Sequence, residues 1–346
     1  MKKYLKIYLC ILLIMAVGFI TAGCNGKVYF TTGFNNDEMI KVSGEVVPMS
    51  LGRLILAVEK SNYASELGDE IWKLEIDGES LWEKLKQTVK IQLSELKTIS
   101  MLAKEKNILL SVSENEKINN ATEEFYNSLS EEEREALGIT KEDVRTLYEY
   151  FRVSEKLYEL TTNGITVEIS DEEARVIKVQ YCFVKKYYYD ENNNEKQLDS
   201  EGVEAARNII EEANAKIKTG TDFSLIVKEY SDDTIYEYEF GRGEMEQNFE
   251  NTAFSLENGE ISDIVESEKG FYIIKCLNSY EELKTEENKG ELLKKYKNKA
   301  FHDMYEPFMA EQTYEYNDKE YNNIDIDSLV LNNNKLYEIY SQYLEE

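Results

Sequence analysis

A chain of 346 residues is too long for one ordinary hydrophobic core, so two or three folding units are expected. Apolar residues make up 42% of the chain, which is enough to bury such cores and argues against general disorder. The formal charge of −28 offers no basic stripe to replace phosphate counterions, and nucleic acid is therefore excluded as a partner. With one histidine, His302, and no closely spaced cysteine pair, neither a metal nor a cofactor is expected.

The first 24 residues have the pattern of an export signal. Three lysines precede an apolar run over 7–20, which ends in small residues and Cys24. This ending resembles the lipobox of bacterial lipoproteins, in which cleavage leaves the cysteine as a lipid-carrying N-terminus. We therefore expect a lipoprotein signal peptide over 1–23, a lipidated tether over 24–38, and an extracytoplasmic protein anchored to the cell membrane through Cys24. An uncleaved N-terminal membrane anchor is the alternative, and it implies the same compartment.

Residues 39–170 predict a helical unit. An alternating run over 39–47 bends at Gly44 and indicates two small strands. Helices are then expected to begin at Ser50, Ser80, Ser113 and Thr140, the last three with a Ser or Thr followed three residues later by an acidic residue. We find no catalytic constellation in this region, so its apolar stripes predict ordinary core packing.

The pattern changes near residue 170, and residues 171–280 predict a small α+β domain. The expected elements are a strand over 176–184, helices over 203–217, 222–230 and 246–254, and a strand over 271–276. After this domain, residues 281–312 predict one long helix with a kink near Pro307. A hairpin over 313–325 and a short helix over 336–344 complete the chain. The long helix carries an apolar stripe, so we expect residues 281–346 to pack on the N-terminal helical domain.

The segment from 174 to 277 resembles the parvulin family of peptidyl-prolyl isomerases. The resemblance rests on motifs that occur in the family's order: Gly220-Thr-Asp-Phe223, Tyr230-Ser-Asp232, Phe240-Gly-Arg-Gly-Glu-Met245, Ala253-Phe-Ser-Leu256, Gly259-Glu-Ile-Ser262 and Gly270-Phe-Tyr-Ile-Ile274. With helical regions on both sides and a lipobox in front, the chain is similar to PrsA-type foldase lipoproteins and SurA-like chaperones. The resemblance implies a mostly helical chaperone unit, formed by both ends of the chain, which carries a parvulin-like domain with an antiparallel sheet.

The resemblance also implies roles for single residues. Met245 and Phe249 correspond to the pocket that holds the proline ring, and Phe240 precedes them on the same wall. Asp233 takes the position beside the substrate carbonyl, and Ser267 matches a small hydroxyl position near the site. Tyr181 and Tyr272 stand where the family has two facing histidines. These tyrosines either preserve the hydrogen-bonded pair or only fill space in the strands.

Two functions follow from these residues. The first is a peptidyl-prolyl isomerase that helps exported proteins fold at the outer face of the membrane. The second is a non-catalytic holdase or scaffold with a degenerate parvulin domain, since the family's histidines and its Gly-Gly-Asp-Leu-Gly loop are both missing. In either case the partners are unfolded or X–Pro-containing exported proteins, because the chain itself has two prolines only. A solute-binding lipoprotein is less favoured, because the βαβ alternation of two lobes is absent.

The two cysteines of the domain are expected to be free thiols. The family implies that the first and last strands of the domain are antiparallel neighbours, with Tyr181 opposite Tyr272. In that register Cys182 and Cys276 are offset by about five residues, or roughly 16 Å at ~3.3 Å per residue. A disulfide needs Cα atoms within about 7 Å.

Overall fold

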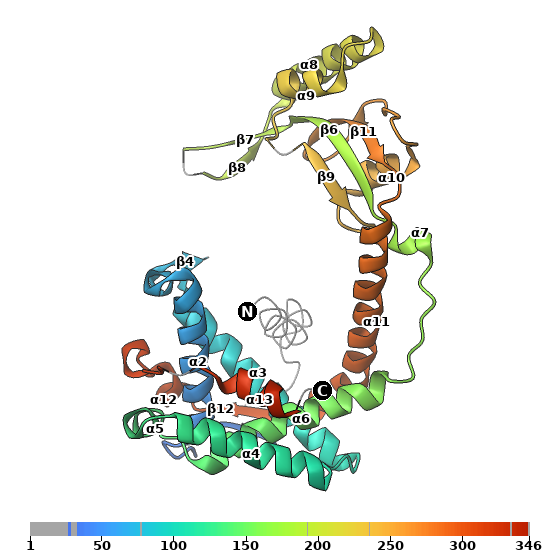
Figure 1. The fold of residues 1–346 in the computed structure, drawn as a ribbon. Coiled ribbons are helices and arrows are strands. Elements are labelled where there is room, and N and C mark those ends of the chain that lie inside the picture. The colour runs from blue at the N-terminus through green and yellow to red at the C-terminus, as the bar shows by residue number, and fades with distance from the viewer. Residues whose placement is uncertain are drawn as a thin grey trace. The chain divides into compact units, whose positions relative to one another are not determined.

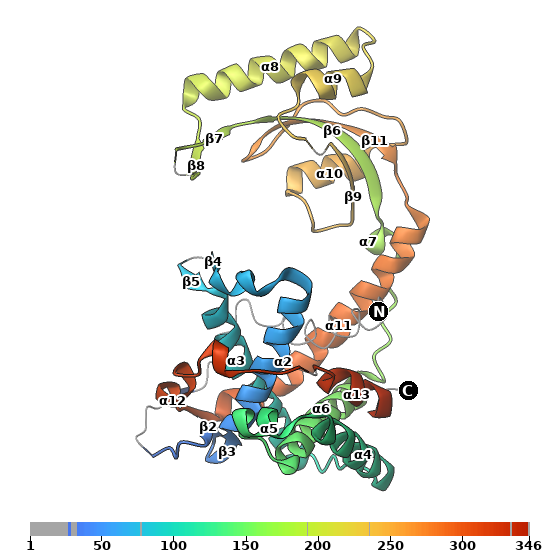
Figure 2. The same ribbon diagram turned by 60° about the vertical axis from the view of Figure 1, so that its left-hand side comes forward.

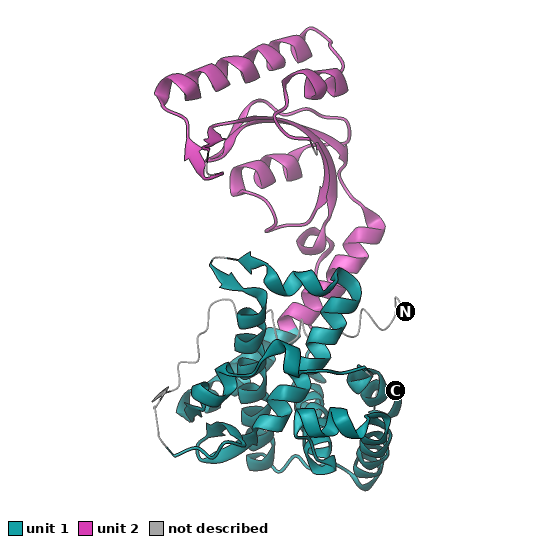
Figure 3. Ribbon diagram, turned by 90° about the vertical axis from the view of Figure 1, so that its left-hand side faces the viewer, with its two compact units in different colours: residues 1–165, 297–346 teal, residues 166–296 magenta. Residues whose placement is uncertain are grey.

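The computed structural model describes the backbone of residues 27–28 and residues 33–344, apart from 77, 192, 235 and 333. The expected signal peptide and Cys24 therefore lie outside the described residues. The chain divides into two compact units, one of residues 1–165 and 297–346 and one of residues 166–296 (Figure 3). Within the described part of the chain, every helix is too short or too polar to span a bilayer.

Unit 1 is mainly helical (Figure 1). Its helices are α2 (Met49–Leu67), α3 (Leu81–Glu105), α4 (Val112–Ser128), α5 (Glu131–Leu137), α6 (Lys141–Thr162), α12 (Asp318–Asn322), α13 (Leu336–Leu344) and the second half of α11 (Glu282–Glu311). A sheet in the order β1-β12-β2-β3 joins Lys27–Val28, Thr313–Tyr316, Glu38–Val42 and Glu45–Pro48. A smaller hairpin pairs β4 (Glu75–Ile76) with β5 (Glu79–Ser80), after the 3-10 turn Asp69–Lys73, and a second such turn spans Ile326–Ser328. The N- and C-terminal parts of the chain therefore share one sheet.

Side-chain caps start four helices of unit 1, α3, α4, α5 and α6. The hydroxyl of Thr140 accepts a hydrogen bond from the Asp143 N–H, and the Asp143 carboxylate accepts one from the Thr140 N–H, as predicted. The predicted start at Ser113 is wrong by two residues, because Ser111 and Glu114 form the capping box of α4. A capping box satisfies two backbone donors that a helix leaves without partners. Ser111 with Glu114 and Ser113 with Glu116 have the same spacing, so the local pattern could not tell the two starts apart.

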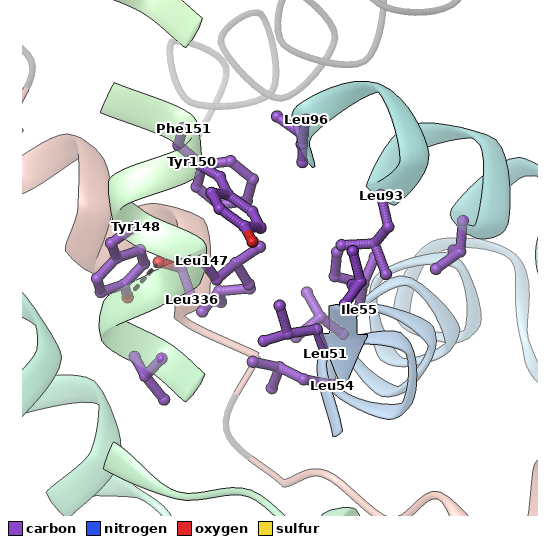
Figure 4. Close-up of a cluster of buried hydrophobic side chains, with 14 of the residues drawn as sticks. Leu51, Leu54, Ile55, Leu93, Leu96, Leu147, Tyr148, Tyr150, Phe151 and Leu336 are labelled. Carbon is purple, nitrogen blue, oxygen red and sulfur yellow. Dashed lines mark hydrogen bonds between the residues drawn. The ribbon is translucent and has the colours of Figure 1, made fainter. Parts of the chain in front are cut away.

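The core of unit 1 brings together helices from both ends of the sequence. Leu51 and Leu54 of α2, Leu93 of α3, Leu147 of α6 and Leu336 of α13 are buried in one cluster (Figure 4). The Tyr148 hydroxyl donates to the Leu336 carbonyl at 2.9 Å, so even the polar end of this buried ring is satisfied.

The predicted hairpin over 313–325 is wrong. Only residues 313–316 form a strand, and this strand pairs with β2, whose Val42 lies opposite Tyr314 although the two are 272 positions apart in the chain. Residues 318–322 form α12, whose Tyr321 is buried and donates a hydrogen bond to the Lys86 carbonyl at 2.9 Å. This non-local pairing and burial decide the structure of the segment, and the local sequence pattern does not record them.

The long helix α11 contributes to both units, whereas packing on the N-terminal helices alone was expected. Its second half places Phe301, Tyr305 and Met309 in the unit 1 core. In its first half, the buried Thr285 hydroxyl accepts from the Val176 N–H at 3.1 Å, and the Asn288 amide donates to the Ala174 carbonyl at 2.9 Å. The boundary of unit 2 therefore falls at residue 296 and not at 280.

Unit 2 is a four-stranded antiparallel sheet with helices on both faces (Figure 2). The strand order is β10-β11-β6-β9, from Val265–Glu266, Gly270–Asn278, Ile177–Lys185 and Glu237–Phe240. Helices α8 (Ser200–Lys218) and α9 (Phe223–Tyr230) cover one face, and α10 (Gln247–Ser255) covers the other. The short helix α7 (Asp171–Ala174) precedes the sheet, and a hairpin of β7 (Tyr187–Tyr189) and β8 (Glu195–Gln197) follows β6. This is the expected α+β arrangement.

The register of the two central strands differs from the expected one by two residues. Tyr272 pairs with Phe183, and Tyr181 pairs with Ile274. The pleat places Cys182 in the cluster under α8 and α9, while Cys276 belongs to the cluster on the opposite face of the sheet. Both cysteines are buried and free. The expected absence of a disulfide is confirmed, although the opposite faces explain it better than the offset along the strands.

Both thiols should therefore react with an alkylating reagent only after denaturation. Burial raises the pKa of Cys182 to about 12 and also raises that of Cys276, so the thiolate forms of both are suppressed at neutral pH. Mass spectrometry of the mature chain without reductant should show neither residue labelled in the native state and both labelled in denaturant. If neither cysteine of the unreduced chain is labelled after denaturation, this register is wrong.

A buried carboxyl should make the stability of unit 1 depend on pH. Glu95 on α3 is 4% exposed, its Oε1 has no hydrogen-bond partner among the described residues, and burial raises its pKa well above the usual range. Because the folded chain holds this proton more tightly than the unfolded chain, its stability relative to Glu95→Gln falls as pH rises above the unfolded pKa. The difference should grow by about 1.4 kcal/mol per pH unit until the folded pKa is reached.

Tryptophan fluorescence during urea unfolding at pH 5, 6 and 7 measures this effect, since Trp72 and Trp82 both lie in unit 1. Glu70→Gln is the matched control, because the Glu70 side chain is 84% exposed. Equal stability differences at the three pH values would show that Glu95 has an ordinary pKa.

Candidate functional site

One face of the unit 2 sheet carries a cluster of aromatic side chains. Phe249 of α10 lies at its centre, with ring centroids 5.7 Å from Tyr181, 5.8 Å from Phe240 and 5.0 Å from Tyr272. The contacts with Tyr181 and Tyr272 are edge-to-face, an arrangement that aromatic rings prefer. Strand alternation in β6 and β11, together with the short helix α10, brings these rings together.

The cluster is open to solvent at three residues. Met245, Tyr272 and Tyr187 are partly buried against it, whereas Phe240 and Phe249 are each 1% exposed. Met245 follows the turn at Gly243, where φ is +86°, and lies just before Glu246, the N-cap residue of α10. An apolar ligand would therefore meet the partly exposed Met245 and Tyr272 before the buried Phe249.

Tyr181 and Asp233 form a hydrogen-bonded pair beside the rings. The Tyr181 hydroxyl donates to Asp233 Oδ2 at 2.8 Å. Burial, and then the hydrogen bond to this carboxylate, raise the pKa of Tyr181 above its ordinary value. The Ser231 hydroxyl accepts from the N–H groups of Phe183 and Asp233, at 3.2 and 3.4 Å, and so ties this segment to β6.

Tyr272 and Ser267 lie at the other side of the site. Burial, followed by the negative charge of Glu246, raises the pKa of Tyr272 to about 12, and a hydrogen bond with Ser267 acts in the opposite direction. The Ser267 hydroxyl also accepts from the N–H groups of Lys269 and Gly270, at 3.1 and 3.2 Å, and thereby fixes the β10–β11 turn. A side chain at Gly270 would overlap the Val184 carbonyl, so this turn requires glycine.

The structure brings all seven sequence-predicted residues of the site to one region. The ring centroids of Tyr181 and Tyr272 are 6.0 Å apart, although their backbones are diagonal neighbours and not directly opposite. Six residues separate Asp233 from Phe240, and β9 begins among these six. The shortened loop therefore continues directly into the edge strand of the sheet.

Sequence reasoning missed two members of the site. Phe183 stacks on Tyr272 at 4.6 Å, and Tyr187 packs against the cluster from the β7–β8 hairpin. The period-2 alternation after Tyr181 was the signal for Phe183, because residues 181 and 183 must share a face. Nothing in the local pattern indicated that the chain after β6 turns Tyr187 back toward the site.

Comparison with known proteins identifies the domain. Residues 193–278 match the family model "Rotamase: PPIC-type PPIASE domain". The chain therefore carries a PPIC-type peptidyl-prolyl isomerase (PPIase) domain. The matched part of this PPIase domain includes Asp233, Met245, Phe249 and Tyr272, and it begins after β6, so Tyr181 lies outside it.

One relative extends the similarity beyond this domain. The foldase protein PrsA of Caldanaerobacter subterraneus subsp. tengcongensis is 28% identical over 290 residues, which cover 80% of this chain and 82% of that protein. Peptidyl-prolyl cis-trans isomerase ESS1 of Saccharomyces cerevisiae is 48% identical over 58 residues, 15% of this chain and 34% of that one. A crystal structure of PrsA from Bacillus cereus matches with 21% identity and a TM-score of 0.39, and covers 79% of this chain and 98% of that one.

Proposed function

We propose that this protein is a peptidyl-prolyl cis-trans isomerase that assists the folding of exported proteins at the outer face of the cytoplasmic membrane. The observation that carries the proposal is the packing of the partly exposed Met245 and Tyr272 against the aromatic cluster of Phe249, inside a PPIC-type PPIase domain. The similarity to PrsA over 80% of the chain, which extends into the helical unit, supports a foldase role.

The chemistry needs neither a nucleophile nor proton transfer. Turning an X–Pro bond costs about 18–20 kcal/mol because the amide loses resonance as it twists. A site that binds the twisted amide more tightly than the planar one lowers this barrier. Met245 and Phe249 would hold the proline ring in an apolar opening, while Tyr181 and Asp233 would hydrogen-bond to each other beside the peptide group.

The site residues predict an activity that is nearly independent of pH around neutrality. The pKa values of Tyr181 and Tyr272 are raised above the ordinary tyrosine value, the latter to about 12, so both hydroxyls keep their protons at neutral pH. We expect kcat/KM to change by less than about twofold from pH 6 to 8, since only histidine has an ordinary pKa in that window. Tyr181→Phe and Tyr272→Phe should each cost about tenfold or less, which corresponds to ~1.4 kcal/mol of barrier.

The pH profile of a proline-peptide assay checks this prediction. A clear inflection near pH 6.5 would contradict it.

The second candidate function is a holdase without catalysis. Two observations favour it: tyrosine occupies both histidine positions of the parvulin pattern, and Phe240 and Phe249 expose only 1% of their surface each. A panel of X–Pro peptides, together with an aggregation assay on an unfolded protein, separates the two functions. Isomerisation above the uncatalysed rate supports the enzyme, while suppressed aggregation without isomerisation supports the holdase.

We further propose that Cys24 carries the lipid anchor and holds the protein extracytoplasmically. The basic residues, the apolar run and the small residues before Cys24 support this assignment. Two acyl chains suffice for stable membrane attachment, whereas one gives only marginal binding.

A further inference from the structure

The β7–β8 hairpin carries three consecutive tyrosines. It continues from the end of β6 as a two-stranded arm (Figure 1), with Tyr187 paired to Gln197 and Tyr189 to Glu195. Tyr188 is 49% exposed and Tyr189 is 55% exposed. Because side chains alternate along a strand, Tyr187 and Tyr189 share one face of the hairpin and Tyr188 lies on the other.

The face of Tyr187 and Tyr189 is continuous with the candidate site. Tyr187 packs against the aromatic cluster together with Met245 and Tyr272. The ring of Tyr189 meets that of Tyr187 edge-to-face, with centroids 5.6 Å apart. An aromatic surface therefore leads from the cluster at Tyr272 across Tyr187 to Tyr189.

Several contacts fix the base of the hairpin next to the site. The Lys186 N–H donates to the Lys269 carbonyl, and the Leu198 N–H donates to the Lys186 carbonyl, both at 2.8 Å. The Lys269 ammonium pairs with Glu195 of β8 at 2.6 Å. The hairpin is thus bonded to the same β10–β11 turn that Ser267 holds in place.

The charges around the hairpin decide which side chain this surface suits. The Lys269 ammonium lies 5.5 Å from the centre of the Tyr187 ring, so the cation–π position of that ring is already occupied by the chain itself. Lys269 is paired with Glu195, and Lys186 is paired with Glu266 at 2.5 Å. Because both ammonium groups already have carboxylate partners, the surface is not suited to an acidic ligand. A neutral apolar side chain is the remaining class that this surface accommodates.

Building on the proposed isomerase function, we propose that Tyr187 and Tyr189 form a subsite that selects X–Pro or Pro–X segments with an aromatic or large aliphatic residue next to the proline. Tyr187 packs against the same cluster as Met245, so it is the aromatic residue of the hairpin that lies next to a proline ring held there. An extended client advances about 3.3 Å per residue, and the residue beside the proline would therefore follow this surface. Its side chain would then pack on the edge of Tyr189.

The test uses the full mature chain and peptides with Phe, Leu, Ala or Glu immediately before or immediately after a single proline. For wild type, kcat/KM should be about five- to tenfold higher for the best Phe or Leu peptide than for its Ala counterpart, and the difference should lie in KM. One aromatic contact contributes a binding free energy of this size. Tyr189→Ala should bring this ratio close to one. Tyr188→Ala is the matched control, with the same residue type on the opposite face of the same hairpin, and should leave the ratio unchanged.

Peptide affinity, measured by NMR titration with the same peptides, separates this subsite from the isomerase function. A wild type that binds the Phe peptides more tightly but does not isomerise them would overturn the proposed function and retain the subsite. The subsite would be overturned if wild type and Tyr189→Ala had the same ratio of Phe-peptide to Ala-peptide efficiency. It would also be overturned if Tyr188→Ala lowered this ratio as much as Tyr189→Ala does.

Discussion

Replacing Met245 and Phe249 together with alanine should lower kcat/KM for prolyl isomerisation by about 100-fold, because it removes the apolar opening that holds the proline ring. Fully burying an aliphatic group of this size contributes about 1.5–3 kcal/mol, and a 100-fold loss corresponds to ~2.7 kcal/mol. Phe249 touches Tyr181, Phe240 and Tyr272 at once, so its loss also releases the rings that shape the opening. Catalytic efficiency on a proline peptide measures the effect.

The stability of unit 2 needs its own control in this experiment. A Phe→Ala change in a core costs about 3–5 kcal/mol and can unfold a domain. Met245→Ala alone alters a partly exposed residue and should still lower kcat/KM by about tenfold, or ~1.4 kcal/mol. Leu225→Ala on α9 is the matched control, since Leu225 is 57% exposed and lies on a helix that covers the opposite face of the sheet. Full activity in a folded Met245→Ala/Phe249→Ala variant would place the proline ring elsewhere.

Replacing Cys24 with alanine should detach the protein from the membrane or leave its precursor uncleaved. The lipid is attached through the cysteine thiol, and alanine offers no atom to carry it. Membrane fractionation and the intact mass of the mature chain report both outcomes. Cys182→Ala is the matched control, because this buried thiol belongs to the core of unit 2.

An unchanged mass and unchanged membrane attachment in Cys24→Ala would contradict the lipobox interpretation. An uncleaved N-terminal anchor would then explain the attachment better. The isomerase proposal does not depend on this outcome, since its residues all lie in unit 2.

Much of the fold could be predicted because its signals are local. Thr140 and Asp143 start α6, Asp222 caps α9, and Gly44 adopts the positive φ of +86° that the turn between β2 and β3 requires. Each feature depends on residues within a few positions of one another. The apolar residues Met245 and Phe249 could be named because the motifs around them resemble the segment that holds the proline ring in parvulins.

The features that could not be predicted depend on distant parts of the chain. The strand pairing was expected from the positions of Tyr181 and Tyr272, yet the rings meet diagonally in a register shifted by two residues, which preserves the face of every side chain. Because an even shift keeps the same residues inside, the hydrophobic pattern cannot distinguish the two registers. The burial of Tyr321 in unit 1 and the return of Tyr187 to the site likewise depend on tertiary contacts.

The central claim is that this chain isomerises prolyl bonds through an apolar ring site that lacks histidine. The most direct measurement is NMR exchange spectroscopy of an X–Pro peptide at pH 7, with a catalytic amount of the full mature chain. Wild type should produce exchange cross-peaks between the cis and trans resonances, and Met245→Ala/Phe249→Ala should produce none beyond the free peptide. The absence of cross-peaks with wild type, or equal cross-peaks with both proteins, would contradict the claim.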